Sequence, residues 1–95
     1  MKATIRWNPE KERVLLEDKT RGGISFADCV IAMDEGRVLE DIPHPVRDGQ
    51  RVMVLRIEDY AYVVPYVEEA DGSLFLKTVF PSRKYTALYL KRDVP

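Results

Sequence analysis

Cysteine and histidine are nearly absent from this chain, which carries one of each, Cys29 and His44, among its 95 residues. A single cysteine excludes an intrachain disulfide and a metal site built on cysteine. One cysteine with one histidine also falls short of the four ligands of a structural zinc site, so we expect no cofactor. Cys29 falls on an apolar helical stripe and is predicted to be buried. His44, between two prolines, is predicted to be an exposed loop residue.

Long apolar runs are missing as well, so the sequence predicts no transmembrane helix and no membrane contact. The segment 1–13 lacks the apolar core of a signal peptide, which favours a cytoplasmic protein. No glycine-rich phosphate loop is present, because Gly22-Gly23 is typical of a helix end. With 45% hydrophobic and 33% charged residues, the chain has the composition of a soluble protein with a single domain, residues 1–95.

Capping and turn residues divide the chain into elements. Asn8-Pro9 predicts the start of a helix that runs to about Thr20, and Ser25 with Asp28 forms a capping box for a second helix that ends at Gly36. Pro65 predicts an edge strand or a bulge, because it cannot donate to a sheet ladder. The expected strands are 3–7, 37–42, 51–58, 60–68 and 74–80, and a closing helix is expected from Arg83 to about Lys91.

The order of these elements predicts an α+β domain. Two N-terminal helices are expected to pack on one face of a four- to five-stranded, mainly antiparallel sheet, followed by a short C-terminal helix. In the strand 51–58, alternation puts Val52, Val54 and Arg56 on one face, and the other face then holds the apolar residues between them.

A basic C-terminal end is the most unusual feature that the sequence does have. The whole chain has 15 Lys and Arg against 16 Asp and Glu, a net charge of −1, which argues against a protein that coats nucleic acid broadly. Residues 75–92 nonetheless hold basic side chains and no acidic one. A local basic cluster can still bind phosphate.

Arginine, lysine and tyrosine together can bind a phosphodiester backbone and stack on a base. Arg51, Arg83 and Lys84 are the candidates for phosphate, and Lys77 and Tyr85 are candidates for further substrate contacts. Arginine also stabilises the charge of a pentacoordinate phosphorane, and the 2′-hydroxyl of RNA is itself a nucleophile, so ribonuclease chemistry does not require histidine. The same basic residues can instead protect a sheet edge or complement a helix dipole.

Four short motifs follow one another along the chain in a defined order. Trp-Asn-Pro-Glu-Lys at 7–11 precedes the first helix, Gly-Ile-Ser-Phe at 23–26 opens the second, a loop from His44 leads to the strand-opening Arg51, and Ser-Arg-Lys-Tyr-Thr at 82–86 follows the last strand. In this order the chain resembles the BrnT-type toxin family of bacterial type II toxin–antitoxin systems over about residues 5–90.

The resemblance implies a RelE-like fold and a metal-independent ribonuclease that inhibits translation. It also implies no cofactor, an RNA substrate that includes ribosome-associated mRNA, and a small cognate antitoxin that also binds DNA. Arg51, Arg83 and Lys84 match the family's basic positions and are the implied catalytic residues. Lys11 matches the opening motif and is a further candidate for substrate contact, and Lys11 or Tyr85 is a candidate to assist proton transfer.

The chain departs from the family pattern at two places. Thr78 stands where the family often has a basic residue, and the nearest base, Lys77, is expected on the other face of its strand. The segment 19–22 lacks the family's usual histidine. The alternative function is a non-catalytic binding module of the same fold, or a decayed toxin. Such a module would bind a protein or RNA partner along a sheet edge or across the face that the helices leave open.

Overall fold

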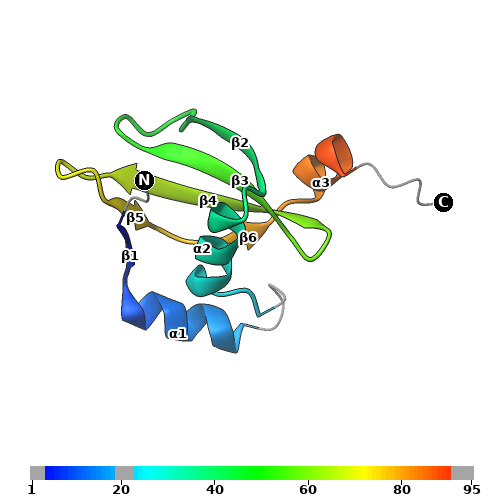
Figure 1. Cartoon of the computed structure of the whole chain (residues 1–95), viewed down its shortest axis with the longest axis horizontal. Helices are drawn as coiled ribbons and strands as arrows, with labels where there is room; N and C mark the ends of the chain where they lie inside the picture. The colour runs from blue at the N-terminus through cyan, green and yellow to red at the C-terminus, as the bar shows by residue number, and fades with distance from the viewer. Residues whose placement is uncertain (1–3, 19–22, 91–95) are drawn as a thin grey trace.

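The computed structural model describes residues 4–18 and 23–90 and confirms the α+β class (Figure 1). Its described part has two N-terminal helices, a mostly antiparallel sheet of six strands and a short C-terminal helix. The elements are β1 (Ile5–Trp7), α1 (Pro9–Glu17), α2 (Phe26–Asp34), β2 (Val38–Pro43), β3 (Arg51–Ile57), β4 (Tyr60–Glu68), β5 (Leu74–Leu76), β6 (Phe80–Pro81) and α3 (Arg83–Tyr89).

Both predicted helix starts are confirmed by their caps. The side chain of Asn8 accepts a hydrogen bond from the backbone of Glu10 at 2.8 Å, and the capping box between Ser25 and Asp28 forms in both directions. The first helix is shorter than predicted and ends at Glu17. Asp18 has an extended backbone, and its N–H donates a hydrogen bond to the Leu15 carbonyl. The predicted end at Thr20 lies outside the described residues, as does Lys91 beyond α3.

The sheet has the strand order β1-β5-β4-β3-β2, with β6 paired to β4. All pairs are antiparallel except β1 with β5, which run parallel. The predicted strand 74–80 is wrong as a single strand, since the chain leaves the ladder between β5 and β6. Leu76 and Val79 are both buried in the same core, so strict alternation fails across residues 77–79. This interruption raises the strand count above the predicted four to five.

Pro65 explains where the interruption falls. Of the two predictions for Pro65, the edge strand is wrong, because β4 lies inside the sheet between β3 and the pair β5 and β6. The bulge agrees with the register, which shifts by one residue between the pairs Tyr66–Leu76 and Val63–Phe80. The Pro65 carbonyl accepts a hydrogen bond from the backbone N–H of Lys77. In a strand, the nitrogen and the carbonyl of one residue point to the same side. The nitrogen of Pro65, which has no hydrogen to donate, therefore also faces the segment between β5 and β6. A proline costs no ladder bond where the neighbouring strand is interrupted.

The two faces of the sheet have separate apolar clusters. The helix-covered face packs against α1 and α2 and includes Leu15, Phe26 and Cys29 from the helices. The ring of Trp7 stacks on Phe26 there, at a centroid distance of 5.7 Å. The opposite side, called the open face below, has a smaller cluster formed by Val52, Val54, Ala61 and Val63, with Tyr85 of α3 packed against it.

Figure 1 shows α1 and α2 together on one side of the sheet and α3 apart from them. The burial of Cys29 and the alternation predicted for β3 are thus confirmed. In the described part of the chain, no helix has the length and apolar character needed to cross a membrane.

Candidate functional site

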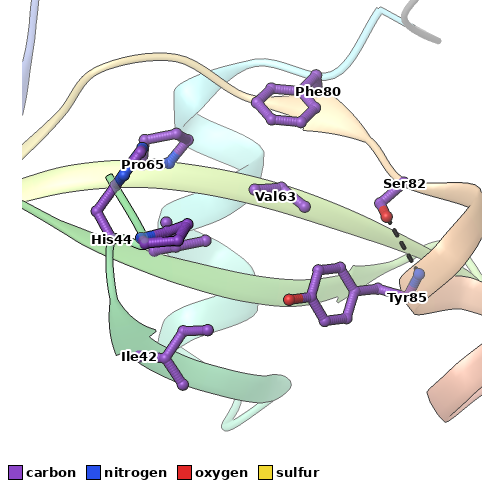
Figure 2. A pocket seen from close by; sticks show the side chains of 9 residues that line it. Ile42, His44, Val63, Pro65, Phe80, Ser82 and Tyr85 are labelled. Carbon is purple, nitrogen blue, oxygen red and sulfur yellow. Dashed lines mark hydrogen bonds between the residues drawn. The ribbon is translucent and has the colours of Figure 1, made fainter. Parts of the chain in front are cut away.

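A hollow of about 300 Å³ lies on the open face, and it is called the open-face hollow below (Figure 2). It is bounded by the end of β2 and the loop after it, the start of β3, the middle of β4, the short β6 and the start of α3. In Figure 2, Phe80 and Tyr85 lie on one side of it and His44 and Pro65 on the other. The lining residues are Ile42, His44, Pro45, Val52, Val63, Pro65, Phe80, Ser82 and Tyr85.

His44 is half-buried at the hollow, in contrast to the exposed loop residue that the sequence predicted. Its Nδ1 accepts hydrogen bonds from the backbone N–H groups of Val46 at 3.1 Å and Arg47 at 3.0 Å. Because both groups donate to Nδ1, the neutral ring carries its proton on Nε2. The imidazole thus has a fixed tautomer in which Nε2–H is a donor.

The helix α3 is held on the open face by two hydroxyl groups. Ser82 caps it by accepting from the backbone of Tyr85 at 3.1 Å. The Thr86 hydroxyl donates to the Ser82 carbonyl at 2.7 Å and accepts from the backbone of Ala61, on β4, at 2.9 Å. No described residue of α3 is fully buried, so these bonds and the Tyr85 ring position the helix.

Arg83 and Lys84 lie between Ser82 and Thr86 in the sequence, and both residues are exposed. The ammonium of Lys84 lies 5.5 Å from the ring centroid of Tyr85, within the range of a cation–π contact. The Tyr85 ring stacks on Tyr89 at 6.2 Å, and the Tyr89 hydroxyl donates to a carboxylate oxygen of Glu40 on β2. The structure therefore brings three predicted site residues, Arg83, Lys84 and Tyr85, to the edge of the hollow.

Lys77 lies on the same face. Val67 lies two residues from Pro65 along β4, so both side chains point to the open face. Phe75 is the cross-strand partner of Val67 and therefore points to the same face. The Lys77 ammonium is 5.7 Å from the Phe75 ring centroid, and its backbone donates to Pro65. The predicted side of the strand for Lys77, opposite Leu76, is therefore confirmed. The same alternation predicts Phe80 on the Leu76 side, which is wrong, because Phe80 pairs with Val63 and lines the hollow on the open face.

Arg51 lies on the other side of the sheet. It pairs with Tyr66 of the helix-covered core, and its guanidinium contacts the Tyr66 hydroxyl at 3.3 Å and the Asp41 carboxylate at 3.1 Å. The structure therefore does not bring Arg51 together with Arg83. Lys11 is on α1, which packs on that same helix-covered face, so it also lies apart from the hollow.

Tyr66, the cross-strand neighbour of Arg51, retains its proton because of burial and its contact with Asp41. Burial, and then the hydrogen bond to Asp41, raise the pKa of Tyr66 to about 12. Its hydroxyl donates to both Asp41 oxygens, at 2.7 and 2.9 Å. The hydrogen bonds that Arg51 donates to Tyr66, and then to Asp41, raise the pKa of the guanidinium. Arg51, Asp41 and Tyr66 thus form a closed network that ties β2, β3 and β4 together.

The remaining nucleophile is not placed for catalysis. Cys29 of α2 is buried in the helix-covered core, and desolvation, followed by the nearby Asp28 charge, raises its pKa to about 12. A protonated, buried thiol does not attack a substrate. Among residues 4–18 and 23–90, no group of three or more His, Cys, Asp or Glu side chains is arranged to hold a metal ion.

Sequence reasoning missed His44 and the hollow itself. The hollow combines segments around residues 42–45, 52, 63–65 and 80–85, which no local pattern connects. The Ser-Arg-Lys-Tyr-Thr motif was a usable signal, since two of its positions hold the helix at the hollow. Comparison with models of protein families, with curated proteins and with solved structures gave no match.

Proposed function

We propose that this protein is a metal-independent ribonuclease of the toxin class, which inhibits translation by cutting RNA at the open face. The observation that carries the proposal is the arrangement of the 82–86 motif. Ser82 and Thr86 are occupied by structural hydrogen bonds, whereas Arg83 and Lys84 are exposed beside the hollow. A fixed helix that presents two cations and the Tyr85 ring fits a ribose–phosphate backbone and a stacked base.

The chemistry uses groups of the RNA itself. The 2′-oxygen attacks the adjacent phosphorus as its proton passes to water, and the bond from phosphorus to the 5′-oxygen breaks. The leaving oxygen takes a proton from water, which gives a 2′,3′-cyclic phosphate and a free 5′-hydroxyl. Arg83 and Lys84 stabilise the negative charge that grows on the phosphoryl oxygens. Lys77 binds a neighbouring phosphate on the same face.

Arg51 has a structural role in this proposal, and Lys11 has no role in cleavage. The Arg51 guanidinium is bound to Asp41 and Tyr66 on the helix-covered face, so it supports the sheet and does not contact the RNA. This reassigns a residue that the family resemblance implied to be catalytic. The proposed partner is a cognate antitoxin of the kind that the resemblance implies, in the cytoplasm of a bacterium.

Purified protein tests the activity directly. Incubated with a fluorescent single-stranded RNA in the presence of EDTA, the wild-type chain is expected to cut, and Arg83→Ala is expected to cut about a hundredfold more slowly. Lys11→Ala removes one cation from the other side of the sheet and is the matched control, which keeps the wild-type rate. Binding without cutting by the folded wild-type protein would favour the non-catalytic binding module.

A further inference from the structure

We propose that the open-face hollow binds one unpaired nucleobase of the RNA, and that His44 sets the preference among bases. The ligand class rests on the proposed function, because the RNA is what brings a base to this face. The inference itself is drawn from the shape, the lining and the hydrogen-bonding groups of the hollow. It identifies the open-face hollow as the specificity pocket beside the phosphate-binding residues.

The walls of the hollow suit a flat aromatic ligand. Phe80 is 37% exposed although it is a large apolar side chain in a strand, and it faces the hollow together with Tyr85 (Figure 2). Val63, only 7% exposed, lies between these rings on the floor. A volume of about 300 Å³ is at the lower end for small-molecule sites, which suits a single base. Aromatic side chains stack on unpaired bases of any identity.

The charges around the hollow favour a ligand attached to phosphate. None of its lining residues is acidic, and Arg83 and Lys84 stand in the chain between the lining residues Ser82 and Tyr85. Lys84 is held near the Tyr85 ring at 5.5 Å. A base seated against Phe80 and Tyr85 would therefore bring its own phosphates toward the helix that carries these two cations.

The polar groups of the hollow provide the base selection. His44 donates through Nε2–H, because the amides of Val46 and Arg47 occupy Nδ1. Ser82 accepts from Tyr85 through its oxygen and retains its own O–H as a donor. Donors at a base pocket select bases that present a keto oxygen at that position over bases that present an amino group.

An apolar peptide side chain is the rival occupant, and the same groups disfavour it. It would fill the space against Val63 and Phe80, but it would cover the His44 Nε2–H and the Ser82 hydroxyl without offering them an acceptor. Covered donors without acceptors weaken binding. The keto oxygen of a base satisfies them.

Nitrogen-labelled protein titrated with the four nucleoside 3′-monophosphates, followed by nuclear magnetic resonance, tests the pocket without requiring cleavage. The amide signals of Val63, Phe80 and Tyr85 are expected to shift, more strongly with uridine or guanosine than with adenosine monophosphate. His44→Asn keeps an acceptor for the amides of Val46 and Arg47 but deletes the Nε2–H donor. We expect this variant to lose the preference among bases, because the Kd for the preferred nucleotide should rise about tenfold.

Phe80→Leu keeps an apolar side chain but removes the stacking ring, and it is expected to weaken all four nucleotides by about tenfold. Val14→Ala, on the exposed side of α1, is the control and leaves binding unchanged. Shifts confined to other residues, or equal binding by wild type, His44→Asn and Phe80→Leu, would overturn the proposal. Nucleotide binding at the hollow without RNA cleavage would uphold the base pocket and overturn the ribonuclease function.

Discussion

The guanidinium Nε of Arg51 lies 3.1 Å from the Oδ1 of Asp41, on the face of the sheet opposite the open-face hollow. The Tyr66 hydroxyl donates to the same carboxylate at 2.7 Å. The pair joins the end of β2 to the start of β3 and lies next to the helix-covered core. A basic residue that the family resemblance marks as catalytic is therefore part of the framework that supports β2 and its following loop.

Arg51→Ala tests this framework role. Both side chains of the ion pair are about two-fifths exposed, 39% and 40%, so solvent screens the interaction and the unfolding free energy should fall only slightly. RNA cleavage by the folded variant should stay within about twofold of wild type, since the guanidinium does not reach the open face. Urea unfolding and a cleavage assay on the same sample measure both. A hundredfold loss of cleavage with unchanged stability would return Arg51 to the catalytic group.

Thr86→Val tests the attachment of α3. Valine has nearly the same shape as threonine but cannot accept from the Ala61 amide, which Thr86 now does at 2.9 Å. An unsatisfied amide costs about 1–3 kcal/mol, so we expect faster hydrogen exchange across α3 and weaker RNA binding. Thr86→Ser retains the hydroxyl and is the matched control. Identical exchange in the valine and serine variants would show that the hydroxyl does not hold the helix.

Alkaline pH should destabilise the fold through buried acids. The pKa of Cys29 is raised from 9.0 to about 12, and that of Tyr66 from 10.0 to about 12. The folded state therefore retains protons that the unfolded chain releases. This stabilisation is complete below about pH 9 and is lost as the pH rises toward 12. Urea unfolding midpoints at a series of pH values should fall over that range.

Cys29→Ala tests whether the Cys29 thiol causes the loss of stability at alkaline pH. It should start from a lower stability, because it leaves a cavity under α2, and it should then decline less steeply with pH. Slopes that are the same in both proteins would mean that the thiol is not the group that titrates.

Local sequence rules predicted the elements whose contacts are local. The Asn8 cap and the capping box at Ser25 both depend on neighbours within a few residues. The strand 74–80 was mispredicted because its break matches Pro65 on the adjacent strand, a contact between distant parts of the chain.

The candidate site was predictable only in part. Arg83, Lys84 and Tyr85 were identified from the composition of one segment, and they do lie together. Alternation along β3 already placed Arg51 on the same face as the core residue Met53, so its separation from Arg83 was in principle available from the sequence. The role of His44 was not predictable from the sequence, because the hollow forms only when β2, β4, β6 and α3 come together.

Induced expression of the chain in a bacterial host, with growth and total RNA followed together, tests the central claim most directly. The account predicts growth arrest with loss of RNA for the wild type and for Arg51→Ala, and relief of both by Arg83→Ala at an equal level of folded protein. Normal growth and intact RNA with a soluble, folded wild-type protein would contradict it.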